Sequence, residues 1–262
     1  MSTYKFHQFI VLDRGPCNTA IIDLLKGDVF QATNQEIEKF EEKKYDEIPS
    51  FIDSLLEAGL VIEVDDNTWI PHLILKKKRE DEKKSQLSII LEIEEGGNWE
   101  KIESLFSNLE IKEISYFGEN YPGDVFPGVP VQKQKKDFSK CISRSSRVGK
   151  FSRIDENFYQ YSREYNNCWG RKIALTQDGK IRPCIYSEIE LGAVDTALNS
   201  REIIDIAWKY WLITRDMVDK CKVCEFRYIC PDCREIAFRS GGTLHSPNPY
   251  CRYDPYSGTY FD

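Results

Sequence analysis

The chain has 262 residues, of which 41% are apolar, enough for a packed core in one large domain or in two to three small ones. Its formal net charge of -7 argues against a general affinity for nucleic acid or anionic membranes, which needs an excess of Lys and Arg. The sequence contains neither a run of eighteen apolar residues nor an N-terminal secretory signal. We therefore expect a cytoplasmic protein whose nine cysteines stay reduced.

The first predicted domain, residues 1–80, contains short elements separated by turn residues. Asn18 is a suitable cap for a helix that ends at Gly27, and Pro49 is placed to begin another helix. Three short helices followed by a hairpin are typical of a winged-helix arrangement. The expected elements are a strand at 5–12, helices at 18–26, 34–43 and 49–58, and a strand, turn and strand over 60–70.

A second domain is expected at residues 81–140, after a charged segment of mixed sign at 76–84 that we interpret as a solvated linker. Its pattern predicts one shortened βαβ unit, with a strand at 87–93, a helix at 98–109 and a strand at 111–117. Three prolines and two glycines then predict an irregular loop over 121–130.

The third expected domain, residues 141–262, carries most of the cysteines. Ser200 begins a helix with an apolar stripe that we interpret as core packing. Four cysteines follow within thirteen residues, so closing loops between their thiolates costs little entropy and the segment is suited to holding metal. The full pattern is Cys168, Gly179, Cys184, Cys221, Cys224, Cys230, Cys233 and Cys251.

This spacing closely resembles the SPASM domain, which binds auxiliary iron–sulfur clusters in radical SAM peptide-modifying enzymes. The motifs around Cys168, Cys224 and Cys251 are similar to those of the peptide maturases in grasp-with-spasm systems, where the gene lies beside an ATP-grasp ligase and a short precursor peptide. One departure is that two residues, Pro231 and Asp232, stand between the last two cysteines of the run, where most SPASM domains have three.

The resemblance implies two 4Fe-4S clusters. Cys221, Cys224, Cys230 and Cys251 would hold the first, while Cys168, Cys184 and Cys233 would hold the second, with one iron left for a further ligand. Cys141 is either that ligand or a buried structural thiol. Cys17 is interpreted as a small core or surface residue. Zinc is the alternative metal, because it also accepts tetrahedral Cys₄ sites.

The radical SAM motif CxxxCxxC is absent from the sequence. We therefore expect a protein that cannot cleave S-adenosylmethionine by itself, and its status as an enzyme stays open.

The N-terminal domain is similar, more distantly, to the peptide-binding modules called RiPP recognition elements, through residues 18–27 and 51–60. Such modules bind a leader peptide as an added strand. The alternative is a packing module that binds nothing.

Three functions remain in competition. In the first, the protein binds a precursor peptide and presents it to an ATP-grasp ligase, with the clusters as structure. In the second, it is an enzyme or electron-transfer subunit that acts on the peptide through a cluster. In the third, it is a zinc-stabilised interaction protein.

Overall fold

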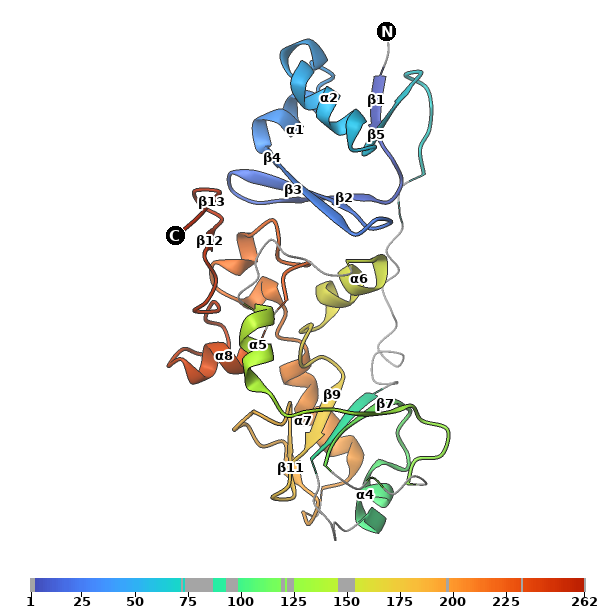
Figure 1. Cartoon of the computed structure of the whole chain (residues 1–262), viewed down its shortest axis with the longest axis vertical. Helices are drawn as coiled ribbons and strands as arrows, with labels where there is room; N and C mark the ends of the chain where they lie inside the picture. Colours follow the sequence, from blue (N-terminus) through green and yellow to red (C-terminus); the bar gives the residue numbers. More distant parts are fainter. Residues whose placement is uncertain are drawn as a thin grey trace.

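The structure is a computed structural model in which the chain forms a mixed α+β protein. One six-stranded mixed sheet and three smaller sheets are present among the described residues. Figure 1 shows the N-terminal elements at one end, the six-stranded sheet at the other and the cysteine-rich C-terminal part between them. The predicted linker at 76–84 lies outside the described residues. Those residues are 3–71, 73, 87–92, 99–118, 121, 125–145, 154–196, 198–231 and 233–261, with backbone alone at 143–145.

The N-terminal part is built around an antiparallel sheet in the order β2-β3-β4. The predicted helix at 18–26 is wrong, because its first six residues form the central strand of this sheet. Ala20 and Ile22 pack on one face of the sheet and Ile21 on the other, so a short apolar run that fits a helix is instead covered on both sides. Gly27, with φ of 80°, closes the turn into the next strand. The strands are β2 (Ile10–Arg14), β3 (Asn18–Asp23) and β4 (Asp28–Thr33).

The other two N-terminal helices are confirmed: α1 spans Asn34–Glu41 and α2 spans Pro49–Glu57. The cap of α1 is Thr33, whose side chain and that of Glu36 form a reciprocal capping box. Tyr45–Glu47 forms a single 3-10 turn between them.

The predicted terminal hairpin is wrong. Residues 69–70 are not in a strand, and β5 (Val61–Val64) pairs with β1 (Thr3–Phe6) instead. The expected arrangement of three helices and a hairpin is therefore not formed. Two α-helices packed on a three-stranded sheet, with a separate strand pair, take its place.

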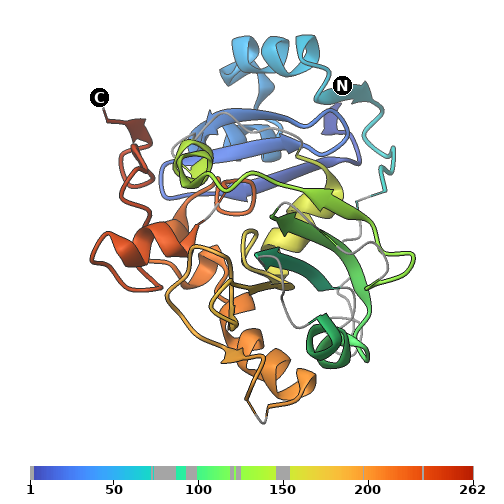
Figure 2. The same cartoon turned by 60° about the horizontal axis from the view of Figure 1, so that its bottom comes forward.

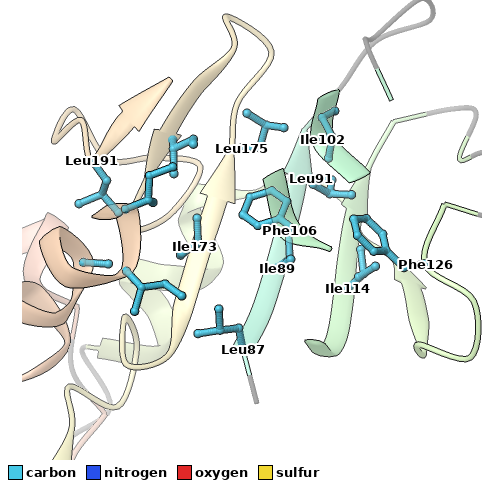
Figure 3. Close-up of a cluster of buried hydrophobic side chains, with 14 of the residues drawn as sticks. Leu87, Ile89, Leu91, Ile102, Phe106, Ile114, Phe126, Ile173, Leu175 and Leu191 are labelled. Atoms are coloured by element: carbon cyan, nitrogen blue, oxygen red, sulfur yellow. The ribbon is translucent and has the colours of Figure 1, made fainter. Parts of the chain in front are cut away.

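The predicted βαβ unit is confirmed. Strand β6 (Leu87–Glu92) pairs in parallel with β7 (Ile111–Phe117), and α4 (Trp99–Phe106) connects them. Phe106 packs with Ile89 and Leu91 in the core of this sheet (Figure 3).

Four more strands extend this pair into the order β11-β10-β9-β6-β7-β8. The pairing of β6 with β9 is parallel, so the sheet joins strands from both sides of residue 141, where the sequence suggested a domain boundary. The remaining strands are β8 (Val131–Lys133), β9 (Lys172–Leu175), β10 (Lys180–Arg182) and β11 (Gly192–Ala193).

Helix α7 (Ser200–Trp211) begins as predicted, with Asn199 as its cap, and packs against the six-stranded sheet. Its residues Ile203, Ile204, Ala207 and Trp211 are buried, which confirms the interpretation of the stripe as core. The further C-terminal elements are α5 (Phe138–Ser145), α6 (Glu156–Glu164), α8 (Arg234–Arg239), β12 (Tyr253–Asp254) and β13 (Thr259–Tyr260). None of the helices in the described ranges combines the length and apolar character needed to cross a membrane.

The sheet β2-β3-β4 has a different partner on each face. One face packs against α1 and α2, with Ile37 and Ile52 in a shared core. The other face packs against the cysteine-rich segment, where Phe226 and Ile229 join Ala20 and Ile22. Figure 2 shows the two helices over one side of this sheet. We call the second contact the seam, and it places the N-terminal part directly on the loop that carries Cys224 and Cys230.

Candidate functional site

The first cysteine set, Cys221, Cys224, Cys230 and Cys251, lies at the seam. A short 3-10 turn begins at Cys221, and a chain reversal follows in which Cys230 donates its backbone N–H to the Phe226 carbonyl. Cys224, Cys230 and Cys251 pack in the same apolar cluster. Burial raises the pKa of the Cys224 thiol, and Glu225, Cys230 and Cys221 raise it further.

A buried arginine that the sequence analysis missed lies against this set. Arg215 is only 4% exposed and donates to the sulfurs of Cys221 at 3.2 Å and Cys230 at 3.5 Å. It also donates to the Pro231 carbonyl. A guanidinium in this position stabilises thiolates and sulfur ligands. No local sequence motif indicates this arginine, because Arg215 precedes Cys221 by six residues and lies in a separate 3-10 turn.

The second set, Cys168, Cys184 and Cys233, is assembled from three separate segments. A hydrogen bond with Cys168 and burial raise the pKa of Cys233. Burial raises the pKa of Cys184 to about 12, and the neighbouring Cys168 contributes. Asn166 fixes the start of the turn at Cys168 by accepting from the backbone N–H groups of Cys168 and Trp169, at 2.9 and 2.8 Å.

One side chain connects the two sets. Asn167, which precedes Cys168, donates to the backbone carbonyl of Cys230 at 2.9 Å. The loop of the first set is thus hydrogen-bonded to the turn that begins the second.

The remaining cysteines and histidines lie in different surroundings. Cys141, on α5, is half-buried, and both it and Cys184 act on the pKa of Tyr186, so it is near the second set. Cys17 is exposed and donates to the Tyr256 carbonyl at 3.0 Å. The ring of His245 contacts the Met217 carbonyl and that of His7 contacts Asp23. His72 lies outside the described residues.

The donor chemistry is consistent with a metal site, although no group of three or more His, Cys, Asp or Glu side chains in the described ranges has metal-binding geometry already formed. Several C-terminal cysteines are buried, and the pKa is raised at Cys224 by burial and at Cys233 by a hydrogen bond with Cys168 together with burial. The Trp169 indole N–H is fully buried and has no hydrogen-bond partner among the described residues. A buried donor without a partner, directly after Cys168 in the chain, suits hydrogen bonding to a sulfur ligand.

The seam itself contains buried charge. Tyr159 donates to both carboxylate oxygens of Asp13 at 3.0 and 2.9 Å, and Arg227 lies 3.9 Å from it. Burial raises the pKa of Asp13 to about 6. Arg227, between Cys224 and Cys230, also donates to the Arg14 carbonyl at 3.2 Å. Strand β2 is thus tied by hydrogen bonds to the cysteine loop.

A groove of about 590 Å³ lies on the N-terminal part, along β2. Strand β2 is an edge of its sheet. The backbone N–H of Leu24 donates to the Phe9 carbonyl, and that of Gly15 donates to the Asn18 carbonyl. In an antiparallel pair every second residue is hydrogen-bonded to the partner strand, so the N–H and C=O of Leu12 point away from β3, to the free edge. The apolar lining of the groove comprises Tyr4, Phe6, Ile10, Val11, Leu12, Phe40, Tyr45, Trp69, Ile70 and Leu73.

Comparisons with known proteins give a distant structural likeness. The sequence matches no protein-family profile, and no curated protein is detectably similar to it. A solved structure of Streptococcus suis SuiB bound to S-adenosylmethionine is similar, with 9% identity and a TM-score of 0.33, over 96% of this chain and 100% of that chain.

Proposed function

We propose that this protein is a metal-binding maturation factor for a ribosomally synthesised peptide. An extended segment of the precursor binds as an added strand along β2, and the protein presents the precursor to an ATP-grasp ligase. The cysteine-rich part holds two metal centres, 4Fe-4S clusters in preference to zinc, which cross-link its loops.

The free edge of β2 beside an apolar groove is the observation that carries this proposal. An edge strand offers unpaired N–H and C=O groups, which can pair with a second chain. The side chains of Ile10 and Leu12 pack toward the core formed with α1, so the groove floor is already built. Backbone pairing then gives affinity, while Trp69 and Tyr45 line the groove that receives alternate side chains of the peptide.

The two cysteine sets would hold the metal centres. Cys221, Cys224, Cys230 and Cys251 would supply four thiolates to the first centre, and Cys168, Cys184 and Cys233 three to the second. The bound metals supply structural cross-links between loops that have little regular secondary structure of their own. Because the first set packs into the seam, its metal would also hold the face of the β2-β3-β4 sheet opposite α1 and α2.

Peptide binding is tested with a substitution that removes one hydrogen-bond donor from the free edge. Leu12→Pro removes an N–H that points away from β3, and proline is tolerated in edge strands for that reason. We expect full-length Leu12→Pro to bind a fluorescently labelled precursor peptide at least about 10-fold more weakly, because one backbone hydrogen bond and the strand geometry are lost. Fluorescence anisotropy measures this.

Two controls identify the cause. Leu12→Ala keeps the N–H and should lose less affinity than Leu12→Pro. Val29→Pro removes an outward N–H from the other edge strand, β4, and should leave binding unchanged. If the Val29→Pro variant alone loses binding, the peptide pairs with β4 and not with β2. If the wild-type protein binds no precursor at high micromolar concentration, the proposed function is wrong.

A further inference from the structure

A pocket of about 460 Å³ lies between helix α6 and three neighbouring strands of the six-stranded sheet. Ser88 of β6, Glu113 of β7 and Lys172 of β9 line it from the sheet, and Tyr161 lines it from α6. Its volume is in the range of pockets that bind small molecules. The groove along β2 is lined by other residues, so the two sites are distinct.

The sheet places opposite charges in one row across this pocket. Ser88 is in register with Lys172 on one side and with Glu113 on the other. Because neighbouring strands are about 4.8 Å apart, the backbones of Lys172 and Glu113 are separated by about 10 Å, with Ser88 between them. The Ser88 hydroxyl donates to Glu113 Oε1 at 2.8 Å and so holds the carboxylate on the pocket side of the sheet.

Within the part of the chain that the structure describes, the charges of this row have no counter-ion. Lys172 and Glu113 are both half-buried, yet neither forms an ion pair there. The same holds for Lys112 and Glu164, which also line the pocket. A partly desolvated charge is stabilised by a nearby charge of opposite sign. A ligand that carries both signs would supply one to each end of the row.

Arg171 adds a second cation to the Lys172 end of the row. It lines the same pocket and is only 8% exposed. Its guanidinium lies 5.1 Å from the centroid of the Tyr165 ring, a cation–π contact that orients the side chain. Its φ of 51° is unfavourable for a residue with this side chain, and strain of this kind is often found at ligand sites. A planar guanidinium next to Lys172 in the chain suits the two oxygens of a carboxylate.

We propose that this pocket binds a free α-amino acid with a large apolar side chain. The carboxylate of the ligand contacts Arg171 and Lys172, and its ammonium group contacts Glu113. Phe158 and Tyr161, half-buried residues of α6, form the apolar wall against its side chain. A phosphate or a simple carboxylate would leave Glu113 without a counter-ion. This inference does not depend on peptide binding along β2.

The first test measures the binding of small probes to the full-length protein by isothermal titration calorimetry. L-phenylalanine and L-leucine are compared with hydrocinnamate, which lacks the ammonium group, with phenethylamine, which lacks the carboxylate, and with inorganic phosphate. We expect both amino acids to bind. Hydrocinnamate and phenethylamine should bind at least about 10-fold more weakly than L-phenylalanine, because each loses hydrogen bonds to a charged group.

Two substitutions assign the contacts. Glu113→Gln should weaken the binding of L-phenylalanine at least about 10-fold and leave that of hydrocinnamate unchanged, whereas Lys172→Met should weaken both. The controls are Glu103→Gln and Lys209→Met, at exposed positions that do not line the pocket, and they should leave binding unchanged. Thermal unfolding of each variant without ligand shows that it is folded.

The inference is wrong if neither amino acid binds at millimolar concentration. It is also wrong if inorganic phosphate or hydrocinnamate binds as tightly as L-phenylalanine, because the pocket would then be an anion site in which Glu113 has no part. Equal affinity of the wild-type protein and the Glu113→Gln variant for L-phenylalanine would overturn it as well.

Discussion

The two cysteine sets differ in how the chain assembles them. Three members of the first set lie within ten residues of one another, beside the cationic Arg215. Cys224, Cys230 and Cys251 pack against a sheet formed by the N-terminal part. The second set draws Cys168, Cys184 and Cys233 from three segments far apart in the chain. The first set should therefore control the seam and the β2 groove, while the second should control the packing of α8 and the turn after β10.

The sharpest way to break this comparison is to remove one thiol from each set. Cys224→Ala should lose the first metal, much of the soluble yield and peptide binding, because structural zinc sites contribute roughly 10–16 kcal/mol of binding free energy to folding. Cys184→Ala should lose the second metal but keep the groove. Metal content, thermal unfolding and precursor anisotropy measure these effects, with Cys17→Ala, at an exposed thiol, as the control. Equal loss of peptide binding in both variants would contradict the separate roles.

The seam should also make the stability of the folded protein depend on pH, through the buried carboxyl group of Asp13. Asp13, whose pKa is raised to about 6, stays protonated in the folded protein at pH values where the unfolded chain has lost the proton. The folded state then binds more protons, so stability falls as pH rises from about 4 to about 6.

Asp13→Asn should remove this dependence. Above pH 7 it should be more stable than wild type by up to about 3 kcal/mol, as the shift in pKa implies. Chemical denaturation at pH 5 and pH 8 measures the difference, and Asp28→Asn, an exposed position, is the control. A difference between Asp13→Asn and wild type that stays constant with pH would show that Asp13 is already charged.

The smallest effect is expected from replacing Arg215, which contacts the first cysteine set. Arg215→Lys keeps the positive charge but cannot donate to two sulfurs and the Pro231 carbonyl at once. The first metal should be released to a chelator roughly 10- to 100-fold faster, while release of the second is unchanged. Faster release of both metals would mean that Arg215 acts on the whole C-terminal fold.

Local sequence signals predicted the elements whose determinants lie close together in the chain. The βαβ unit, α1, α2 and α7 each have an apolar stripe or strand run within one segment, and all four form. The helix predicted at 18–26 failed because the burial of both faces of β3 depends on α1, α2 and the cysteine loop, which the segment itself does not encode.

In the candidate site, too, the features encoded within one segment could be predicted from the sequence, and those that depend on tertiary contacts could not. The spacing of Cys221, Cys224 and Cys230 predicts a metal-binding loop by itself, but it does not indicate Arg215, which lies in another turn. Glu235 is two residues from Cys233 in the sequence, yet only the structure shows that its side chain is fully buried. The partners of a ligand are set by the tertiary fold.

Because β3 is buried on both faces, the N-terminal part cannot be transferred to another protein unchanged. An N-terminal segment cut after residue 73 and grafted onto another protein would carry the groove, but it would leave Ala20, Ile22 and Leu24 facing water where Phe226 and Ile229 had covered them. Such an exposed apolar face favours self-association. A transplant would need a resurfaced sheet, with polar residues replacing these three, before it could work outside its own chain.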